Sequence, residues 1–129
     1  MKLADHEERS LLMFGRKYTE IHTFLDQYFT LFGPYHRYCL HHQKGIALAV
    51  NKFKGPVRQV AEQHILDDLD LIPKDWSAGF EIELDFADYW VSRKAKLPRG
   101  KLIDTVRMLY PADAGAIPDP KPIEQLMYK

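Results

Sequence analysis

The sequence predicts a mainly α-helical protein, and three observations lead to that fold class. Apolar residues recur every three or four positions along most of the chain up to about Leu71, which is the period of an amphipathic helix. The pairs Gly33-Pro34 and Gly55-Pro56 interrupt this pattern, and such pairs mark helix ends. At 129 residues the chain is too short for two ordinary domains. We therefore expect one helical domain over residues 1–110 and a tail over residues 111–129.

The first half of the chain contains four expected helices. Asp5 can cap a helix over residues 6–17, whose first turn is acidic, as the helix dipole favours. A second helix begins at Thr19 and ends at Gly33-Pro34. A third covers residues 34–53, and a fourth follows Pro56 and reaches about Leu71. The connection between the third and fourth helices is so short that they are expected to form a central antiparallel hairpin.

The second half of the chain has a less regular pattern. Apolar and acidic residues alternate over residues 80–86, which is typical of a half-buried strand. A helix that continues through Tyr89 and Trp90 is the alternative, because no partner strand is evident. A last helix is expected from about Gly100 to Pro111. The four prolines of residues 111–129 predict an extended or partly disordered tail.

Composition narrows the classes of partner and location. Eighteen basic residues balance eighteen acidic residues, so the basic excess that nucleic-acid binding uses is absent and nucleic acid is not the favoured partner. No apolar run approaches the roughly 18 residues of a membrane span, which predicts a soluble protein without a membrane partner. Cys39 is the single cysteine. It excludes an internal disulfide and fits a reducing compartment, so we expect a cytoplasmic location.

The central hairpin is expected to bring histidine and aspartate side chains together. In a regular third helix, His42 shares the inward stripe with Ile46 and Phe53. On the fourth helix, His64 and Asp68 are four residues apart on the apolar face. His42 lies about as far before the turn as Asp68 lies after it. The hairpin therefore predicts a buried cluster of His42, His64 and Asp68.

Three interpretations of this cluster stay open. It can be a buried hydrogen-bond network in which Asp68 orients the two imidazoles. It can be a metal site, because imidazole and carboxylate suit zinc, manganese or iron, or it can be an acid–base pair that works without metal. No standard signature such as His-Glu-x-x-His is present. The accessory candidates, which lie at the edge of the cluster or nearby in sequence, are His36, His41, Glu62 and Asp67.

The hairpin also carries a family resemblance. The segments that carry it are His36-Arg37 with His41-His42 and Gly45-Ile46, then Glu62-Gln63-His64 with Asp68, then Ile72-Pro73 with Asp75-Trp76. Over residues 19–76 this pattern resembles a small uncharacterised bacterial and phage family of the domain-of-unknown-function kind. The resemblance implies a helical module and marks His36, His41, His42, Glu62, His64 and Asp68 as motif positions. It implies no substrate.

Two functions follow as hypotheses. The first is a small non-enzymatic binding or accessory protein with a structural or metal-stabilised cluster. The second is a metal-dependent hydrolase in which His42, His64 and Asp68 hold the ion and Glu62 or Asp67 is the general base. Apolar residues left over in residues 80–90 and in the tail also predict a homodimer. We expect His64→Ala to cost on the order of 2–4 kcal/mol, whereas His6→Ala and His22→Ala should be nearly neutral.

Overall fold

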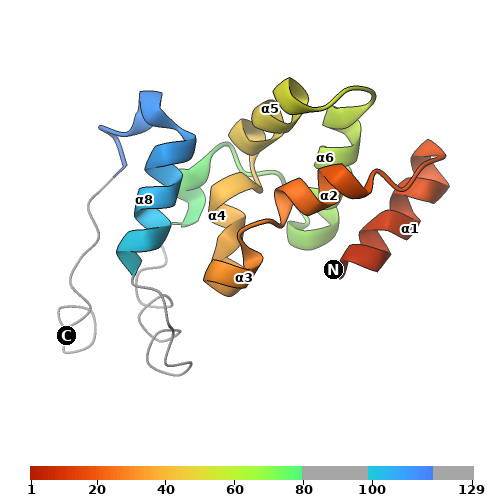
Figure 1. Ribbon diagram of the computed structural model, residues 1–129, viewed down its shortest axis with the longest axis horizontal. Helices are drawn as coiled ribbons and strands as arrows, with labels where there is room; N and C mark the ends of the chain where they lie inside the picture. The colour runs from red at the N-terminus through yellow and green to blue at the C-terminus, as the bar shows by residue number, and fades with distance from the viewer. Residues whose placement is uncertain (80–98, 118–129) are drawn as a thin grey trace. The chain divides into compact units, whose positions relative to one another are not determined.

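The computed structural model describes residues 1–79 and 99–117. These residues form helices and no strand (Figure 1), which confirms the mainly α-helical class. The chain divides into two compact units, Met1–Trp76 and Ser77–Lys129, and each is described by itself. The expected boundary at residue 110 is a different division and stays a prediction.

The first expected helix is present but begins before Asp5, which therefore does not cap it, and the second is shorter than expected. Helix α1 spans Leu3–Phe14 and ends at Gly15, whose φ of 78° is in the left-handed region that glycine adopts without strain. Helix α2 starts at Thr19, as predicted, but ends at Leu25. A short helix α3, Phe29–Phe32, follows it. The single helix expected up to Gly33 is therefore interrupted, and Asp26 lies at the interruption.

The expected third helix over residues 34–53 is wrong, because three separate pieces occupy that range. They are a 3-10 turn η1, Gly33–His36, then α4, Arg37–Leu40, and then α5, Gln43–Lys52. The chain bends sharply between α4 and α5, where His42 is fully extended with φ −163°. Gly45 permits this bend, because a Cβ atom there would overlap the backbone carbonyl of Leu40.

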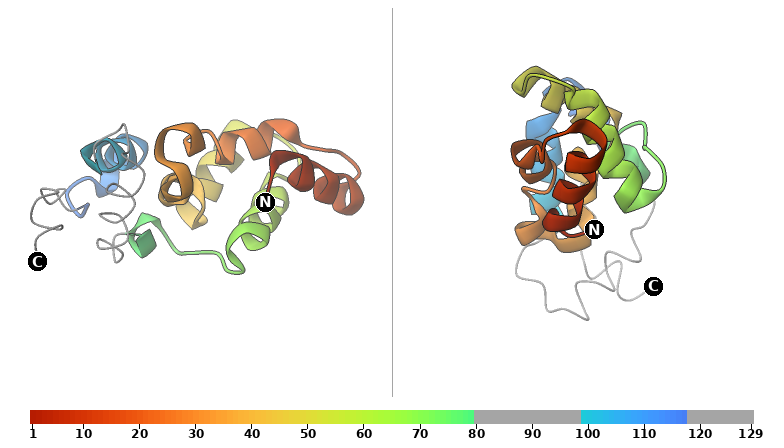
Figure 2. Two further views of the ribbon diagram at one scale, coloured as in Figure 1. Left: turned by 90° about the horizontal axis from the view of Figure 1, so that it is seen from below. Right: turned by 90° about the vertical axis from the view of Figure 1, so that its right-hand side faces the viewer.

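Helix α6, Val57–Leu69, agrees with the expected fourth helix and ends at Asp70, which has φ 63°. The short link folds α6 back against α5 (Figure 1), so the helical hairpin is present. Helices α1 and α2 also pack on α6, as the two further views in Figure 2 show. The core between these helices consists mainly of small and branched apolar side chains: Ile21, Leu25, Ile46, Ala49, Val60, Ala61 and Ile65.

The described part of the second unit is also helical. After the 3-10 turn η2, Trp76–Gly79, it contains helix α8, Arg99–Leu109, and the turn η3, Pro111–Asp113. Helix α8 confirms the expected last helix and buries Leu102, Ile103 and Val106. The strand expected over residues 80–86 and most of the tail lie outside the described residues. None of the described helices combines the length and apolar character that a bilayer span requires.

Candidate metal centre

A buried group of histidine and aspartate side chains lies where α1, α2 and α6 meet the end of α4. His6 comes from α1, and His22 and Asp26 come from α2 and its C-terminal end. His41 follows α4 directly. His64 and Asp68 are one turn apart on α6. All four histidines are at most 2% exposed, so the packing of four separate segments places them in the interior.

Four ligand atoms of this group converge on one point. They belong to Asp26, His41, His64 and Asp68, and all lie within 4.8 Å of one another. Nε2 of His64 is 3.1 Å from Oδ1 of Asp26 and 3.3 Å from Oδ2 of Asp68. Nε2 of His41 is 3.4 Å from the same Asp26 oxygen and 3.0 Å from the same Asp68 oxygen. The two nitrogens and the two oxygens therefore alternate around a common centre. We call these atoms the four-atom set: Oδ1 of Asp26, Nε2 of His41, Nε2 of His64 and Oδ2 of Asp68.

The spacing of the four-atom set matches that of ligands around a small cation. Ligands at about 2.0–2.1 Å from zinc lie about 3.3 Å from each other in a tetrahedron, and neighbouring ligands in an octahedron lie about 3.0 Å apart. The four nitrogen-to-oxygen separations, 3.0 to 3.4 Å, fall in this range. The donors are two nitrogens and two oxygens, a combination that suits zinc, manganese and iron.

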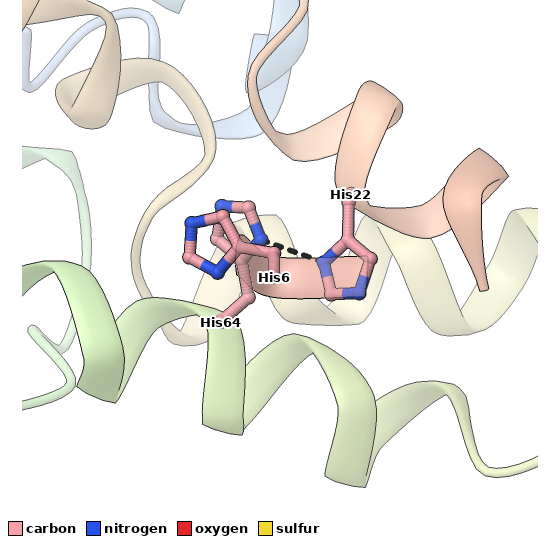
Figure 3. A group of neighbouring side chains, drawn as sticks. All are labelled: His6, His22 and His64. Atoms are coloured by element: carbon pink, nitrogen blue, oxygen red, sulfur yellow. Dashed lines mark hydrogen bonds between the residues drawn. The ribbon is translucent and has the colours of Figure 1, made fainter. Parts of the chain in front are cut away.

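A second chain of contacts holds the ring of His64 from its other side. Nδ1 of His64 is 2.8 Å from Nδ1 of His22, and Nε2 of His22 is 2.7 Å from Oγ of Ser10. Figure 3 shows His22 pointing from α2 toward His64, with the contact dashed. If Nε2 of His64 binds a cation, its Nδ1–H donates to His22, whose Nε2–H then donates to Ser10. Outer hydrogen bonds of this kind orient histidine ligands.

His6 contacts both His64 and Asp68. Its ring is stacked on the ring of His64 with centroids 3.6 Å apart, and the two overlap in Figure 3. Its Nε2 is 3.1 Å from Oδ1 of Asp68, and the amino group of Met1 contacts that oxygen at 2.9 Å. Asp68 thus turns Oδ2 toward the four-atom set and Oδ1 toward α1.

Hydrogen bonds between the histidines and the aspartates of this group shift their pKa values. Burial tends to raise the pKa of Asp68, but hydrogen bonds from His41, His6 and His64 outweigh it and hold that pKa well below its usual value. Burial tends to lower the pKa of His64, yet its hydrogen bonds to Asp26 and Asp68 raise the pKa above 6.5. For His41 burial dominates and lowers the pKa. Burial likewise tends to raise the pKa of Asp26, but its hydrogen bond with His64 and the nearby histidines outweigh it and lower that pKa. Both carboxylates are therefore ionised at neutral pH and favour a cation between them.

The residues expected from the sequence are only partly brought together. His64 and Asp68 meet as predicted. His41, which was expected to be an accessory residue, belongs to the four-atom set. His36 lies at the edge, with Nε2 4.0 Å from Asp26. Asp67 instead pairs with Gln63 at 2.8 Å and Arg9 at 3.4 Å. Glu62 is not among the candidate metal ligands found in the described residues.

His42 does not join His64, which corrects the expected position of this residue. Its Nδ1 accepts the backbone N–H of Gly45 at 3.2 Å and so caps the first turn of α5. Its Nε2 donates to the carbonyl of Tyr38 at 3.0 Å. The expectation assumed a continuous helix through His42. Because the chain bends there, the helical spacing no longer predicts the direction in which the His42 side chain points. Both ring nitrogens serve the backbone here.

Sequence reasoning missed Asp26, His6, His22 and Ser10. One signal was available, because His22 and Asp26 have the same four-residue spacing on an expected helix as His64 and Asp68. The structure also places His6 and His22 among buried partners, so substitutions there are no longer expected to be neutral.

A pocket of about 580 Å³ opens beside the four-atom set. Asp26, His41 and Asp68 form part of its lining, together with His36 and Arg37. A cation bound by the four-atom set would therefore have one side toward this pocket. Structural metal sites are closed, whereas catalytic sites keep a position open.

The fold and the site define a small helical domain with a buried histidine–carboxylate centre next to a pocket. The family model described as "Domain of unknown function (DUF6915)" matches residues 1–85, and the chain belongs to this family. The match fits the resemblance to an uncharacterised domain family, while the motif pattern and the bacterial or phage origin stay expectations. Comparisons with curated proteins and with solved structures found no match.

Proposed function

We propose that the domain binds one divalent transition metal ion through Asp26, His41, His64 and Asp68. The observation that carries the proposal is the four-atom set, in which each imidazole Nε2 faces the same two carboxylate oxygens at 3.0 to 3.4 Å. One N–H can point fully at only one of two acceptors. A central cation uses all four contacts at once, and zinc, manganese and iron are the candidates.

The alternative without metal is a network of hydrogen bonds and ion pairs. A protonated His64 between two carboxylates fits this alternative, because the pKa of His64 is raised by its hydrogen bonds to Asp26 and Asp68, which outweigh its burial. The two alternatives make different predictions for metal content. They also differ in the effect of a chelator on stability, since metal-binding energy adds to folding energy only where an ion is held.

The direct experiment is elemental analysis of the purified protein, followed by zinc titration in metal-free buffer. Wild type should hold about one ion per chain. Asp68→Asn and His41→Ala should lower the affinity by at least about tenfold, a typical effect of disturbing a ligand shell. Two adjacent residues give matched controls: Asp67→Asn and His42→Ala remove the same groups outside the four-atom set. Zinc binding that is undetectable in wild type, or equal in Asp68→Asn and Asp67→Asn, would refute the proposal.

The pocket favours a metal-dependent hydrolase over a purely structural ion, and we propose this as the second step. A bound divalent ion would supply a Lewis acid and an activated water. Glu62 and Asp67, the general bases expected from the sequence, are absent from the pocket lining. His36 does line it, and burial lowers the pKa of His36 to about 4, so its ring is neutral at pH 7 and can orient a bound water by accepting a hydrogen bond from it.

Hydrolysis by the metal-loaded protein distinguishes the hypothesis of a non-enzymatic accessory protein from that of a hydrolase. If the ion is structural, removing it lowers the melting temperature and the metal-loaded protein hydrolyses no ester. If it is catalytic, His36→Gln should lower hydrolysis while the metal content stays near one per chain. A panel of chromogenic phosphate, carboxylate and phosphodiester substrates separates these outcomes.

Two further proposals concern assembly and location. We propose a homodimer, on the basis of the apolar residues in residues 80–90 and in the tail; both segments lie largely outside the described residues. Light scattering on the full chain and on a chain that ends at Pro111 tests it, and a full-length monomer at micromolar concentration would refute it. A cytoplasmic location is proposed because Cys39 is buried and forms no disulfide.

A further inference from the structure

The lining of the pocket beside the four-atom set combines two kinds of polar group. Asp26, His41 and Asp68 of the four-atom set contribute two carboxylates and an imidazole. Arg37 and Lys2 contribute two cationic side chains. Three apolar residues, Leu3, Phe29 and Leu69, complete much of the lining. A volume of about 580 Å³ lies within the range of small-molecule sites.

Arg37 has no carboxylate partner among the described residues. Its guanidinium lies over the ring of Tyr38, 5.3 Å from the centroid, and Nη2 donates to the Tyr38 hydroxyl at 3.4 Å. Asp26 and Asp68 line the same pocket but pair with histidines instead. The aromatic ring therefore supports the guanidinium and leaves most of its N–H groups available.

The charge of the pocket side chains depends on the ion. Without a cation, the negative charges of Asp26 and Asp68 oppose the positive charges of Arg37, Lys2 and the amino group of Met1 in this lining. With a divalent ion in the four-atom set, the two carboxylate charges are neutralised and the charges of Arg37, Lys2 and the Met1 amino group remain. These positive charges match a phosphate monoester, which carries about −1.5 to −2 at pH 7, better than they match a single carboxylate. Guanidinium groups also bind phosphate oxygens in pairs.

We infer that this pocket binds a phosphate monoester of a small apolar or aromatic group, with the phosphate between the metal ion and Arg37. This inference rests on the metal site proposed above. Phe29 is 55% exposed although it is aromatic, and it lines the pocket. The organic part of the ligand packs on Phe29 and the leucines of the lining, while Lys2 adds to the electrostatic attraction.

The test is calorimetric titration of the zinc-loaded, desalted protein with inorganic phosphate and with phenyl phosphate. Wild type should bind both, and phenyl phosphate more tightly. Arg37→Gln should weaken both by at least about tenfold, the effect of losing one charge-assisted contact. Arg58→Gln is the matched control, since Arg58 is an exposed arginine outside the pocket lining. The metal-free protein should bind phosphate at least about tenfold more weakly than the loaded protein.

The possible failures are distinguishable. Zinc bound at one per chain with equal phosphate binding by wild type and Arg37→Gln would overturn this inference and leave the metal site standing. Benzoate that binds as tightly as phenyl phosphate would overturn the phosphate class. Absence of zinc binding would overturn both proposals. Should Arg37→Gln fail to fold, Phe29→Ala takes its place: it should abolish the preference for phenyl phosphate over phosphate, and an unchanged preference would refute the inference.

Discussion

His22 and His64 face each other through their Nδ1 atoms at 2.8 Å, although 42 positions separate them in the chain. One of the two nitrogens must donate and the other accept, so the contact couples the tautomers of the two rings. Because Nε2 of His64 belongs to the four-atom set, His22 acts on the candidate metal site without contacting the ion. This relationship yields the first prediction.

Replacing His22 with alanine should weaken zinc binding by about 10- to 100-fold, the usual effect of removing a hydrogen-bond partner of a histidine ligand. It should also lower the free energy of unfolding by about 1–3 kcal/mol, because a buried N–H is left without an acceptor. Zinc titration and urea unfolding measure the two effects. Ser10→Ala, one step further along the chain of contacts, should have a smaller effect on affinity. Equal zinc affinities of wild type and His22→Ala would contradict the predicted role.

The metal-free protein should lose stability as the pH falls from 6.5 to about 4. Burial is the main cause that lowers the pKa values of His22, His36 and His42 to about 4. An unfolded histidine has a pKa near 6.5, so in this range the unfolded chain binds protons that the folded chain resists. The stabilisation is thus present above pH 6.5 and disappears toward pH 4, by on the order of 1–3 kcal/mol per residue.

His64 contributes with the opposite sign. Its folded pKa is raised, so its stabilisation is complete below pH 6.5 and decreases as the pH rises through the folded value. The combined effect of His22, His36 and His42 is larger than that of His64, so the free energy of unfolding decreases on acidification. Urea unfolding in chelator at pH 7, 6, 5 and 4.5 measures the profile, and His42→Gln should flatten it. A free energy of unfolding that rises toward pH 4.5 would show that the signs are wrong.

Gly45→Ala should be among the most damaging small substitutions in the first unit. A Cβ atom at this position would overlap the carbonyl of Leu40, and relieving the overlap requires α4 and α5 to separate. Overpacking of this kind costs about 1–3 kcal/mol or more. Gly115→Ala is the matched control, because no atom lies within 4 Å of a Cβ there. Thermal unfolding compares the two, and equal melting temperatures would disprove the close approach of α4 and α5.

Cys39 should be unreactive toward thiol reagents in the folded protein at pH 7 to 8. Burial raises the pKa of its thiol to about 12, so almost no thiolate is present, and the side chain is 0% exposed. Reactivity requires an accessible thiolate. A chromogenic disulfide reagent should therefore react only after urea is added. Rapid reaction of the native protein would show that the core around α4 opens readily.

The secondary structure was largely readable from the sequence, and the site was readable only in part. Helix α6 and the proximity of His64 to Asp68 follow from local spacing alone, because four residues make one turn of a helix whatever surrounds it. The same reasoning was available for His22 and Asp26. It placed His42 incorrectly, because helical phase carries over only where the helix is continuous, and the chain bends at His42.

The sequence by itself determined a mainly helical chain, the hairpin of α5 and α6 and a histidine–aspartate pair on the inner face of α6, since all of these depend on local period and turn residues. Only the tertiary structure decided that His41 and Asp26 complete the four-atom set and that His6, His22 and Ser10 surround it. Those contacts join residues up to 62 positions apart. They depend on how α1, α2 and α6 pack and on the bend that Gly45 allows beneath Leu40, and no local pattern encodes the relative placement of separate helices.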